Sequence, residues 1–363
     1  MSFELKQYIK PDFKEKSFLE APDAKIASVE KDGVAPDDFH ATSIFPEYFK
    51  VNGEWLCATS SRMDCVPVLE EGKILAKEIR RLKKGDKVII GRSEDGKEGI
   101  YVHHNGFMEN DNVADPFAFR KNRSRETSFS KEYDEISELL KYEKDNGNIL
   151  WVLGPALSFD RNAREAFAAL VNNGYVDGVC AGNALATHDL EAAYLHTALG
   201  QNIYTQENVH NGHYHHLETI NKVREDGSIK EFIKNRNIDN GIMWALENND
   251  IPYVLAGSIR DDGPLPEVTA DVYEVQDRMR KLTDQATTVI CLATMLHTIA
   301  IGNMTPSYRV MDDGNLRQVY FYVVDISEFM TNKLVDRGSL SSRSIITNVQ
   351  DFVVKVAKNL GVN

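Results

Sequence analysis

Charged side chains follow one apolar run of the sequence at a position suited to recognising an amino acid. Residues 252–256 are mostly apolar, and the segment that follows contains Arg260, Asp261 and Asp262. The planar guanidinium of Arg260 can bind a carboxylate through two hydrogen bonds, while Asp261 or Asp262 can bind an amine or a cofactor hydroxyl group. A structural network of ion pairs would gather the same charges, so both interpretations stay open.

Three of the ten histidines lie close together, in the segment GHYHH at 212–216. Imidazole groups titrate near neutral pH and can transfer protons or bind metals. No Cys, Asp or Glu lies at a clear metal-ligand spacing from them, so we predict substrate contact or proton transfer, and no metal site. A structural cluster at a domain interface is the alternative. The three residues are His213, His215 and His216.

An aspartate and a cysteine precede another apolar run, at 66–69. The carboxylate of Asp64 could face a cleft between domains and hold a substrate ammonium group, or it could simply form a turn. Cys65 is a candidate nucleophile, although the sequence places neither a histidine nor a helix N-terminus beside it to activate the thiol.

The elements that must position these groups form a repeating pattern from residue 148 onward. Short apolar runs alternate with segments of helical period, which is typical of a parallel sheet covered by helices on both faces. The predicted fold class is therefore α/β, with a parallel Rossmann-like domain at 148–363. The expected strands are 149–153, 176–180, 252–256, 288–293, 319–324 and 344–346. The expected helices are 162–173, 189–198, 217–236, 241–249, 272–282, 328–336 and 349–359.

Small or polar residues follow most of the expected strands, and this predicts a ligand crevice. Open parallel sheets bind ligands outside the carboxyl ends of their strands, where glycine admits the ligand and helix N-termini attract phosphate. Glycine-rich turns also serve tight packing, so each loop has that alternative. The GxGxxG fingerprint is absent, which argues against a simple dehydrogenase. The loops are 154–156 beginning with Gly154, 181–184, 257–263, 294–297 and residue 325.

Two of these strand ends carry a residue that suits a cofactor. Asp325 stands between a strand and a helix, where a carboxylate can accept hydrogen bonds from an adenosine ribose, which favours NAD over NADP. An acid favoured by the helix dipole is the alternative. Asn348 followed by Asp351 has the spacing of a helix N-cap with an acid in the first turn, and the amide of Val349 would be the donor to a cofactor there.

The first third of the chain has a different pattern. Short β segments separated by turns predict a small, mostly antiparallel β domain at 31–108, and Asn52-Gly53 predicts a hairpin. An N-terminal extension at 1–30 precedes this domain. A polar linker with a connecting helix follows it at 109–147, and the helix is centred on 133–142.

Composition limits the class of protein. The net charge is −13 and no long block of Lys and Arg occurs, so neither nucleic acid nor a membrane surface is an expected partner. No apolar run is long enough to span a bilayer, the opening residues lack a signal-peptide pattern, and the four cysteines have no CxxC spacing. We expect a soluble, cytoplasmic enzyme that acts on a small molecule and forms a homo-oligomer.

Several segments together resemble a known family. The chain is similar to archaeal-type ornithine cyclodeaminases, to the C-terminal half of the cyanobacterial arginine dihydrolase/ornithine cyclodeaminases, and to the conserved region first described in lysine-ketoglutarate reductase/saccharopine dehydrogenase-related proteins. The resemblance covers residues from about Gly33 to the end. The matching segments are GVAPDDF (33–39), VNGEW (51–55), MDC (63–65), AGNALATHDLEAA (181–193), GHYHHL (212–217), LAGSIRDDGPLP (255–266), ATMLH (293–297), GN (302–303) and DRGS (336–339).

The resemblance implies a deoxyhypusine-synthase-type Rossmann domain that binds NAD. It also implies a conversion of L-ornithine to L-proline and ammonia, in which NAD takes a hydride from Cα and later returns it to a cyclic imine. Arg260, the histidine segment and Asp64 are candidates for the carboxylate clamp and the acid/base groups. The cofactor positions carried over are Asn183, Ala184, Asp262, Thr294, Met295, Leu296, His297, Asp325, Ile326, Asn348 and Val349.

Two departures from the family pattern bear on the substrate. The opening 28 residues differ, and residues 307–317 have the pattern of an inserted hairpin or loop. The chain has no room for an N-terminal dihydrolase module, so we do not expect arginine to be the substrate. The alternatives are a related NAD-dependent enzyme that oxidises another amino acid or amine through an imine, and a catalytically silent NAD-binding sensor.

Overall fold

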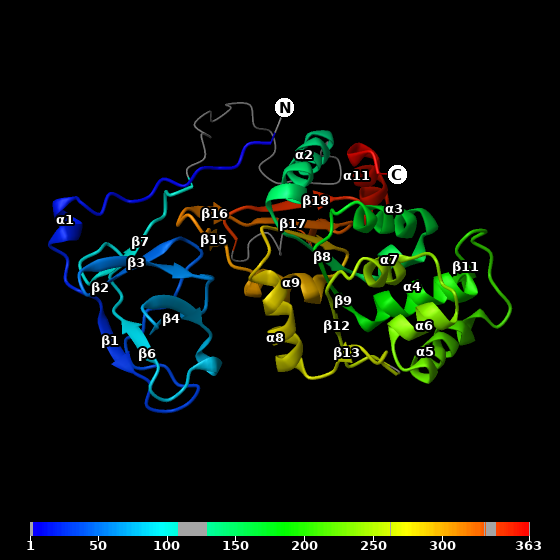
Figure 1. The fold of residues 1–363 in the computed structure, drawn as a ribbon, viewed down its shortest axis with the longest axis horizontal. Helices are drawn as coiled ribbons and strands as arrows, with labels where there is room; N and C mark the ends of the chain where they lie inside the picture. Colours follow the sequence, from blue (N-terminus) through cyan, green and yellow to red (C-terminus); the bar gives the residue numbers. More distant parts are fainter. Residues whose placement is uncertain (1–2, 108–128, 262, 330, 332–338, 363) are drawn as a thin grey trace.

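The computed structural model describes residues 3–107, 129–261, 263–329, 331 and 339–362. Within these residues the chain forms two seven-stranded sheets, one in its first third and one in the remainder (Figure 1). Residues 109–128 of the expected linker and most of the helix expected at 328–336 lie outside the described residues.

The first sheet confirms the predicted small β domain. Its order is β1-β6-β4-β5-β3-β2-β7, and every pair is antiparallel except β3 with β5. Asn52 and Gly53 form the predicted hairpin turn with φ angles of 52° and 81°. The sheet already begins at Lys25, inside the segment expected as an extension. The strands are β1 (Lys25–Ser28), β2 (Glu47–Val51), β3 (Glu54–Thr59), β4 (Val66–Glu70), β5 (Lys73–Lys77), β6 (Lys87–Ile90) and β7 (Ile100–Val102).

The opening segment runs from one domain to the other (Figure 1). Phe3 packs its ring against Tyr320 of the second sheet, with 5.6 Å between ring centroids. The hydroxyl group of Tyr8 lies 2.8 Å from the hydroxyl group of Tyr48 and 2.9 Å from Nδ1 of His103, both in the β domain. The first residues of the chain therefore contact both domains.

The second sheet is parallel throughout, as predicted. Strands buried on both faces produce the continuous apolar runs seen in the sequence. In chain order the strands are β8 (Ile149–Leu153), β9 (Gly178–Gly182), β12 (Tyr253–Ala256), β13 (Val268–Thr269), β14 (Thr288–Leu292), β17 (Tyr320–Asp325) and β18 (Ser342–Ile346).

The order of these strands creates a crevice. Across the sheet it is β13-β12-β9-β8-β14-β17-β18, so the chain builds outward from β8 in one direction, then crosses to β14 and builds in the other. Apart from the short edge strand β13, this is the Rossmann order, third-second-first-fourth-fifth-sixth. The reversal falls between β8 and β14, and ligands of such sheets bind beyond the strand ends at that point.

Helices cover both faces of the parallel sheet (Figure 1). Alternate residues of β8 show the division, since Trp151 packs with the helices of one face while Leu150 and Val152 pack with those of the other. The first face is covered by α2 (Ser130–Asn146), α3 (Arg161–Asn172), α4 (Asn183–Leu195), α5 (His215–Asp226), α6 (Ile229–Asn235), α7 (Ile242–Asn248) and α11 (Val349–Leu360). The second is covered by α8 (Val272–Thr283) and α9 (Met295–Met304).

Three helices differ from the prediction. α4 begins directly after β9 at Asn183, not at residue 189, and α9 occupies the segment expected as a loop at 294–297. Neither helix has the one-sided apolar pattern of a surface helix, because α4 is buried on most sides and α9 is apolar nearly all round. The single helix expected at 217–236 is two helices, because Gly227 adopts a φ of 90° and Ser228 caps α6.

The segment expected as an insertion is a hairpin, β15 (Tyr308–Val310) with β16 (Leu316–Gln318). The hydroxyl group of Tyr308 donates to Ala58 O of the β domain at 2.9 Å. Arg317 pairs with Glu143 of α2, and both side chains are almost fully buried. The hairpin therefore connects the two domains.

Candidate functional site

A cavity of about 520 Å³ lies at the carboxyl ends of β9 and β12. Because parallel strands end at the same edge of a sheet, the loops that follow them meet here. It brings together Asn183, Ala184, His213, His216, Arg260 and Asp261, all predicted as site residues, with Pro155, Phe159, Thr187, His188, Leu199, Gly200, Ile220 and Ser258.

The N-terminus of α4 forms one wall of the cavity. Gly182 precedes the helix and offers no side chain to cap it, so the first backbone N–H groups of α4 have no intrahelical acceptor. The side-chain oxygen of Asn183 accepts from Leu265 N at 3.0 Å, which fixes the orientation of its amide. This wall suits an anionic group of a ligand.

The loop after β12 forms a second wall, and its own hydrogen bonds fix its shape. The carboxylate of Asp261 accepts from the backbone N–H of Ser258 at 2.8 Å and from its hydroxyl group at 3.3 Å. Asp261 thus shapes the loop, whereas the exposed side chain of Arg260 lines the cavity. Asp262 lies outside the described residues.

The third wall contains a histidine that the sequence analysis missed. Nδ1 of His188 lies 2.8 Å from Oε2 of Glu191, one turn further along α4. Glu191 is only 1% exposed, and the His188 ring packs edge-on against Phe159 with 5.3 Å between centroids. The signal available in the sequence was the spacing of histidine and glutamate three residues apart, which brings both side chains to one helix face.

Of the three histidines in the segment at 212–216, two line the cavity and one does not. His213 and His216 line the cavity, and the His216 ring lies 6.1 Å from the His188 ring. Nδ1 of His215 lies 2.7 Å from the hydroxyl group of Thr197. No group of three or more His, Cys, Asp and Glu side chains placed to hold a metal ion occurs within the described residues.

The crevice between β8 and β14 is bordered by tightly apposed loops. A side chain at Gly154 would collide with the backbone oxygen of Ala293, which itself adopts a left-handed φ of 46°. Thr294 then precedes α9 as its N-cap residue, and the ring of His297 lies 3.1 Å from where a Cβ would stand on Gly182. Burial lowers the pKa of His297, so its ring is neutral at pH 7.

The ends of β17 and β18 carry the other predicted cofactor residues. Asp325 is the last residue of β17, and its Oδ1 accepts from Ser327 N at 2.9 Å. The predicted N-cap is confirmed, since the side chain of Asn348 accepts from the N–H groups of Gln350 and Asp351. Val349 is the buried first residue of α11.

Large apolar side chains are exposed along the strand ends. Met295, Leu296 and Ile326 are 43%, 74% and 57% exposed. Met295 and Leu296 are the first residues of α9, which follows β14, and Ile326 directly follows β17. Exposed apolar side chains gathered on one edge are typical of a surface that binds a ligand or a partner.

Asp64 and Cys65 are not part of this arrangement. Asp64 is exposed in a turn with a φ of 64°, which matches the turn-forming alternative. Cys65 is 2% exposed and burial raises the pKa of its thiol, so the nucleophile hypothesis is wrong: the thiol stays protonated at neutral pH and is inaccessible.

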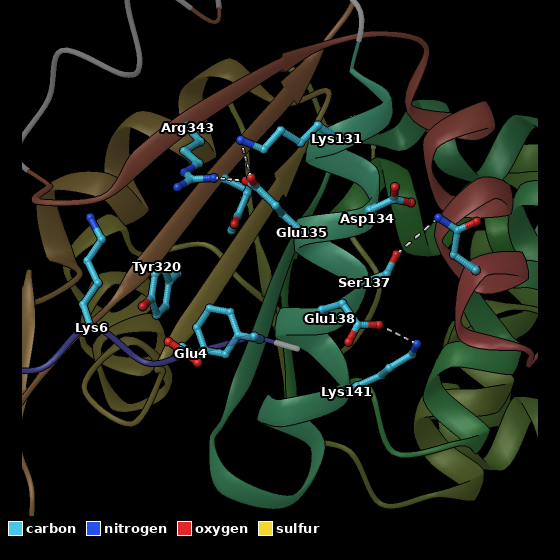
Figure 2. Close-up of a pocket in the computed structure, with 13 residues that line it drawn as sticks. Glu4, Lys6, Lys131, Asp134, Glu135, Ser137, Glu138, Lys141, Tyr320 and Arg343 are labelled. Atoms are coloured by element: carbon cyan, nitrogen blue, oxygen red, sulfur yellow. Dashed lines mark hydrogen bonds and ion pairs between the residues drawn. The ribbon is translucent and has the colours of Figure 1, made fainter. Parts of the chain in front are cut away.

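A larger cavity of about 680 Å³ lies at a distance from these loops (Figure 2). It is bordered by α2 and by the beginnings of β17 and β18, the strand ends opposite to Asp325. Glu135 there pairs with Arg343 and Lys131, and Glu138 pairs with Lys141 (Figure 2). None of the predicted site residues lines it.

Comparison with known proteins places this chain among characterised sequences. Residues 134–356 match the family described as "Arginine dihydrolase ArgZ-like, C-terminal, Rossmann fold", and residues 46–128 match its "first region". An ornithine cyclodeaminase of Methanopyrus kandleri is 37% identical over 93% of this chain and 78% of its own length. No helix among the described residues is long and apolar enough to cross a membrane.

Two solved structures are similar to this one. A putative LOR/SDH protein of Methanococcus maripaludis superimposes with a TM-score of 0.84 at 36% identity, covering 94% of this chain and 98% of the other. AgrE, crystallised as a ternary complex with ornithine and NAD+, superimposes with a TM-score of 0.60 at 32% identity, covering 94% of this chain and 46% of AgrE.

Proposed function

This chain belongs to the family of the archaeal ornithine cyclodeaminases and the ArgZ-like C-terminal region, and on that premise we propose that it is an NAD-dependent ornithine cyclodeaminase. The reaction would convert L-ornithine to L-proline and ammonia. One observation carries the proposal: an arginine and three histidines line one cavity beside the crevice of a Rossmann sheet. A relative crystallised with ornithine and NAD+ supports the choice of ligands.

The residues at the strand ends fit a dinucleotide. Asp325 would bind the adenosine ribose, the amide of Val349 beside Asn348 would donate to the cofactor, and the exposed Met295, Leu296 and Ile326 would contact its rings. The segment from Thr294 to His297, with Gly154, Asn183 and Ala184, would border the nicotinamide half. When bound, NAD supplies a hydride acceptor that becomes a hydride donor later in the same cycle.

The side chains of the cavity would handle the amino acid. Arg260 would bind the α-carboxylate, because its guanidinium matches that group with two hydrogen bonds. The histidines would take a proton from the α-ammonium group before Cα is oxidised to an imine. The δ-amine would then attack the imine carbon, ammonia would leave, and the cyclic imine would be reduced to proline.

The test is to incubate the purified protein with NAD+ and L-ornithine and to measure proline and ammonia. We expect equal amounts of both products, with no net accumulation of NADH. Reactions without NAD+ and reactions with L-lysine or L-arginine are the controls. Binding of NAD without release of ammonia from ornithine would refute the cyclodeaminase proposal and leave a silent NAD-binding protein.

Replacing Asp325 with alanine should weaken NAD binding about tenfold, because a charged acceptor for the ribose hydroxyl groups is lost. Titration of intrinsic tryptophan fluorescence with NAD+ measures the dissociation constant. Glu165→Ala, which removes an exposed acid of α3 paired with Arg161, is the control and should change nothing. An unchanged dissociation constant for Asp325→Ala removes the ribose role.

A further inference from the structure

We propose that His188 is the general acid/base of the reaction, and that Glu191 positions it with the help of Thr197 and His215. The proposal rests on the proposed function, because it assigns a role within that site. From the sequence, the acid/base groups were expected in the segment at 212–216 or at Asp64.

The His188 ring is held in one orientation. Its Nδ1 is held at 2.8 Å by Oε2 of Glu191, and an ionised carboxylate can only accept, so Nδ1 carries a proton. The other ring nitrogen, Nε2, then has a lone pair available for a substrate proton. His188 lines the cavity with its side chain 14% exposed, so the ring is shielded but reachable.

Glu191 is buried beside His188. A carboxylate at 1% exposure is costly unless hydrogen bonds and a positive partner compensate it. Oε1 accepts the hydroxyl proton of Thr197 at 2.8 Å, so both oxygens are occupied. Having donated its only proton, Thr197 must accept from Nδ1 of His215 at 2.7 Å. His188 is therefore the group in this chain of hydrogen bonds that can become positively charged beside Glu191, and it does so when it takes a proton.

The neighbouring acid on α4, Asp189, has a structural role. Asp189 accepts from Arg164 Nε at 2.7 Å and from the N–H groups of Ile242 and Met243 at the beginning of α7. This network anchors α4 against α3 and α7. Glu191 is bonded instead toward the cavity, and a histidine without such a partner would be free to rotate.

Other titratable groups near His188 are His213 and His216 from the segment preceding and beginning α5, and Arg260 and Asp261 from the loop after β12. Asp261 is held by its own loop. Within the part of the chain that the structure describes, none of these four side chains forms a hydrogen bond to a buried acid like the bond from His188 to Glu191. The geometry thus distinguishes His188 from the other histidines.

The proton steps balance within the proposed reaction. His188 takes a proton from the α-ammonium group at Nε2, and the electron pair of that N–H bond stays on the nitrogen. Oxidation at Cα then transfers a hydride to NAD. The δ-ammonium group loses a proton to water before it attacks, and the new ring nitrogen loses a second proton to water after it has added. The bond from Cα to the α-nitrogen then breaks, the electron pair leaves with that nitrogen, and His188 returns its proton to form ammonia.

The experiment compares His188→Gln, Glu191→Gln, Thr197→Ser and Thr197→Val with the wild type, and His210→Gln is the matched control at an exposed histidine. We expect His188→Gln to lower kcat for ornithine at least about 100-fold while the dissociation constant of NAD changes less than twofold. Glu191→Gln should lower kcat about tenfold. The kcat of Thr197→Ser should resemble that of the wild type. The kcat of Thr197→Val should lie between those of the wild type and Glu191→Gln.

The dependence of kcat on pH separates positioning from a purely structural role. Activity should rise with pH as His188 becomes neutral, and in Glu191→Gln the acidic limb should move to lower pH, because the protonated ring loses its neighbouring negative charge. An unchanged pH profile in Glu191→Gln refutes the positioning role. Turnover by His188→Gln within threefold of wild type refutes the acid/base role alone, whereas inactivity of the wild type on ornithine refutes the proposed function as well.

Discussion

Replacing Arg317 with leucine should lower the free energy of unfolding by about 3–5 kcal/mol. Arg317 pairs with Glu143, and their side chains are only 4% and 0% exposed. Arg317 also donates to Asn146 O at 2.7 Å. Without the guanidinium, the Glu143 carboxylate stays buried with Thr287 as its remaining hydrogen-bond donor, at 2.5 Å, and a hydroxyl group does not compensate a buried negative charge.

Urea denaturation followed by circular dichroism measures this loss. Arg343→Leu is the control, because Arg343 pairs with Glu135 at side-chain exposures of 38% and 36%, and pairs of that kind contribute about 1 kcal/mol or less. The double variant Glu143→Leu with Arg317→Leu should recover much of the stability, since it removes both charges. A loss below about 1 kcal/mol in Arg317→Leu would mean that Glu143 reaches water or another partner.

The parallel sheet was predictable because burial on both faces leaves a signal in its longer strands, although the two-residue edge strand β13 was not predicted. The run at 149–153 is apolar at each position, and β8 has those bounds. α4 and α9 left no such signal, because neither helix has its apolar residues on one side and a polar stripe on the other to mark its period. The helix expected at 189–198 therefore began too late, and His188 was left outside it.

The sequence predicted which loops form the site, but not which role each side chain has in it. Strand ends of a parallel sheet must meet, so Asn183 and Arg260 could be placed together without a structure. The partner of a side chain is set by packing between distant segments, as with Thr197, which links Glu191 to His215. The same limit explains Cys65, whose burial depends on contacts that its neighbours in sequence do not reveal.

The second large effect is expected at Arg260. Replacing it with methionine, which keeps the unbranched stem of the side chain and removes the guanidinium, should lower kcat/KM for L-ornithine about 100- to 1000-fold, because two charge-assisted hydrogen bonds to the substrate carboxylate are lost. The kcat/KM of Arg260→Lys should lie between those of the wild type and Arg260→Met, since an ammonium group binds a carboxylate without the paired geometry. NAD binding should not change.

A substrate without a carboxylate isolates the role of Arg260. Putrescine has the two amines of ornithine and no carboxylate, so the wild type should turn it over poorly, and Arg260→Met should lower that rate no further. The two losses are then not additive, which is the signature of a direct interaction between the side chain and the missing group. If Arg260→Met instead reduces turnover of both substrates by the same factor, Arg260 shapes the loop after β12 or holds the cofactor, and the carboxylate must be bound elsewhere in the cavity.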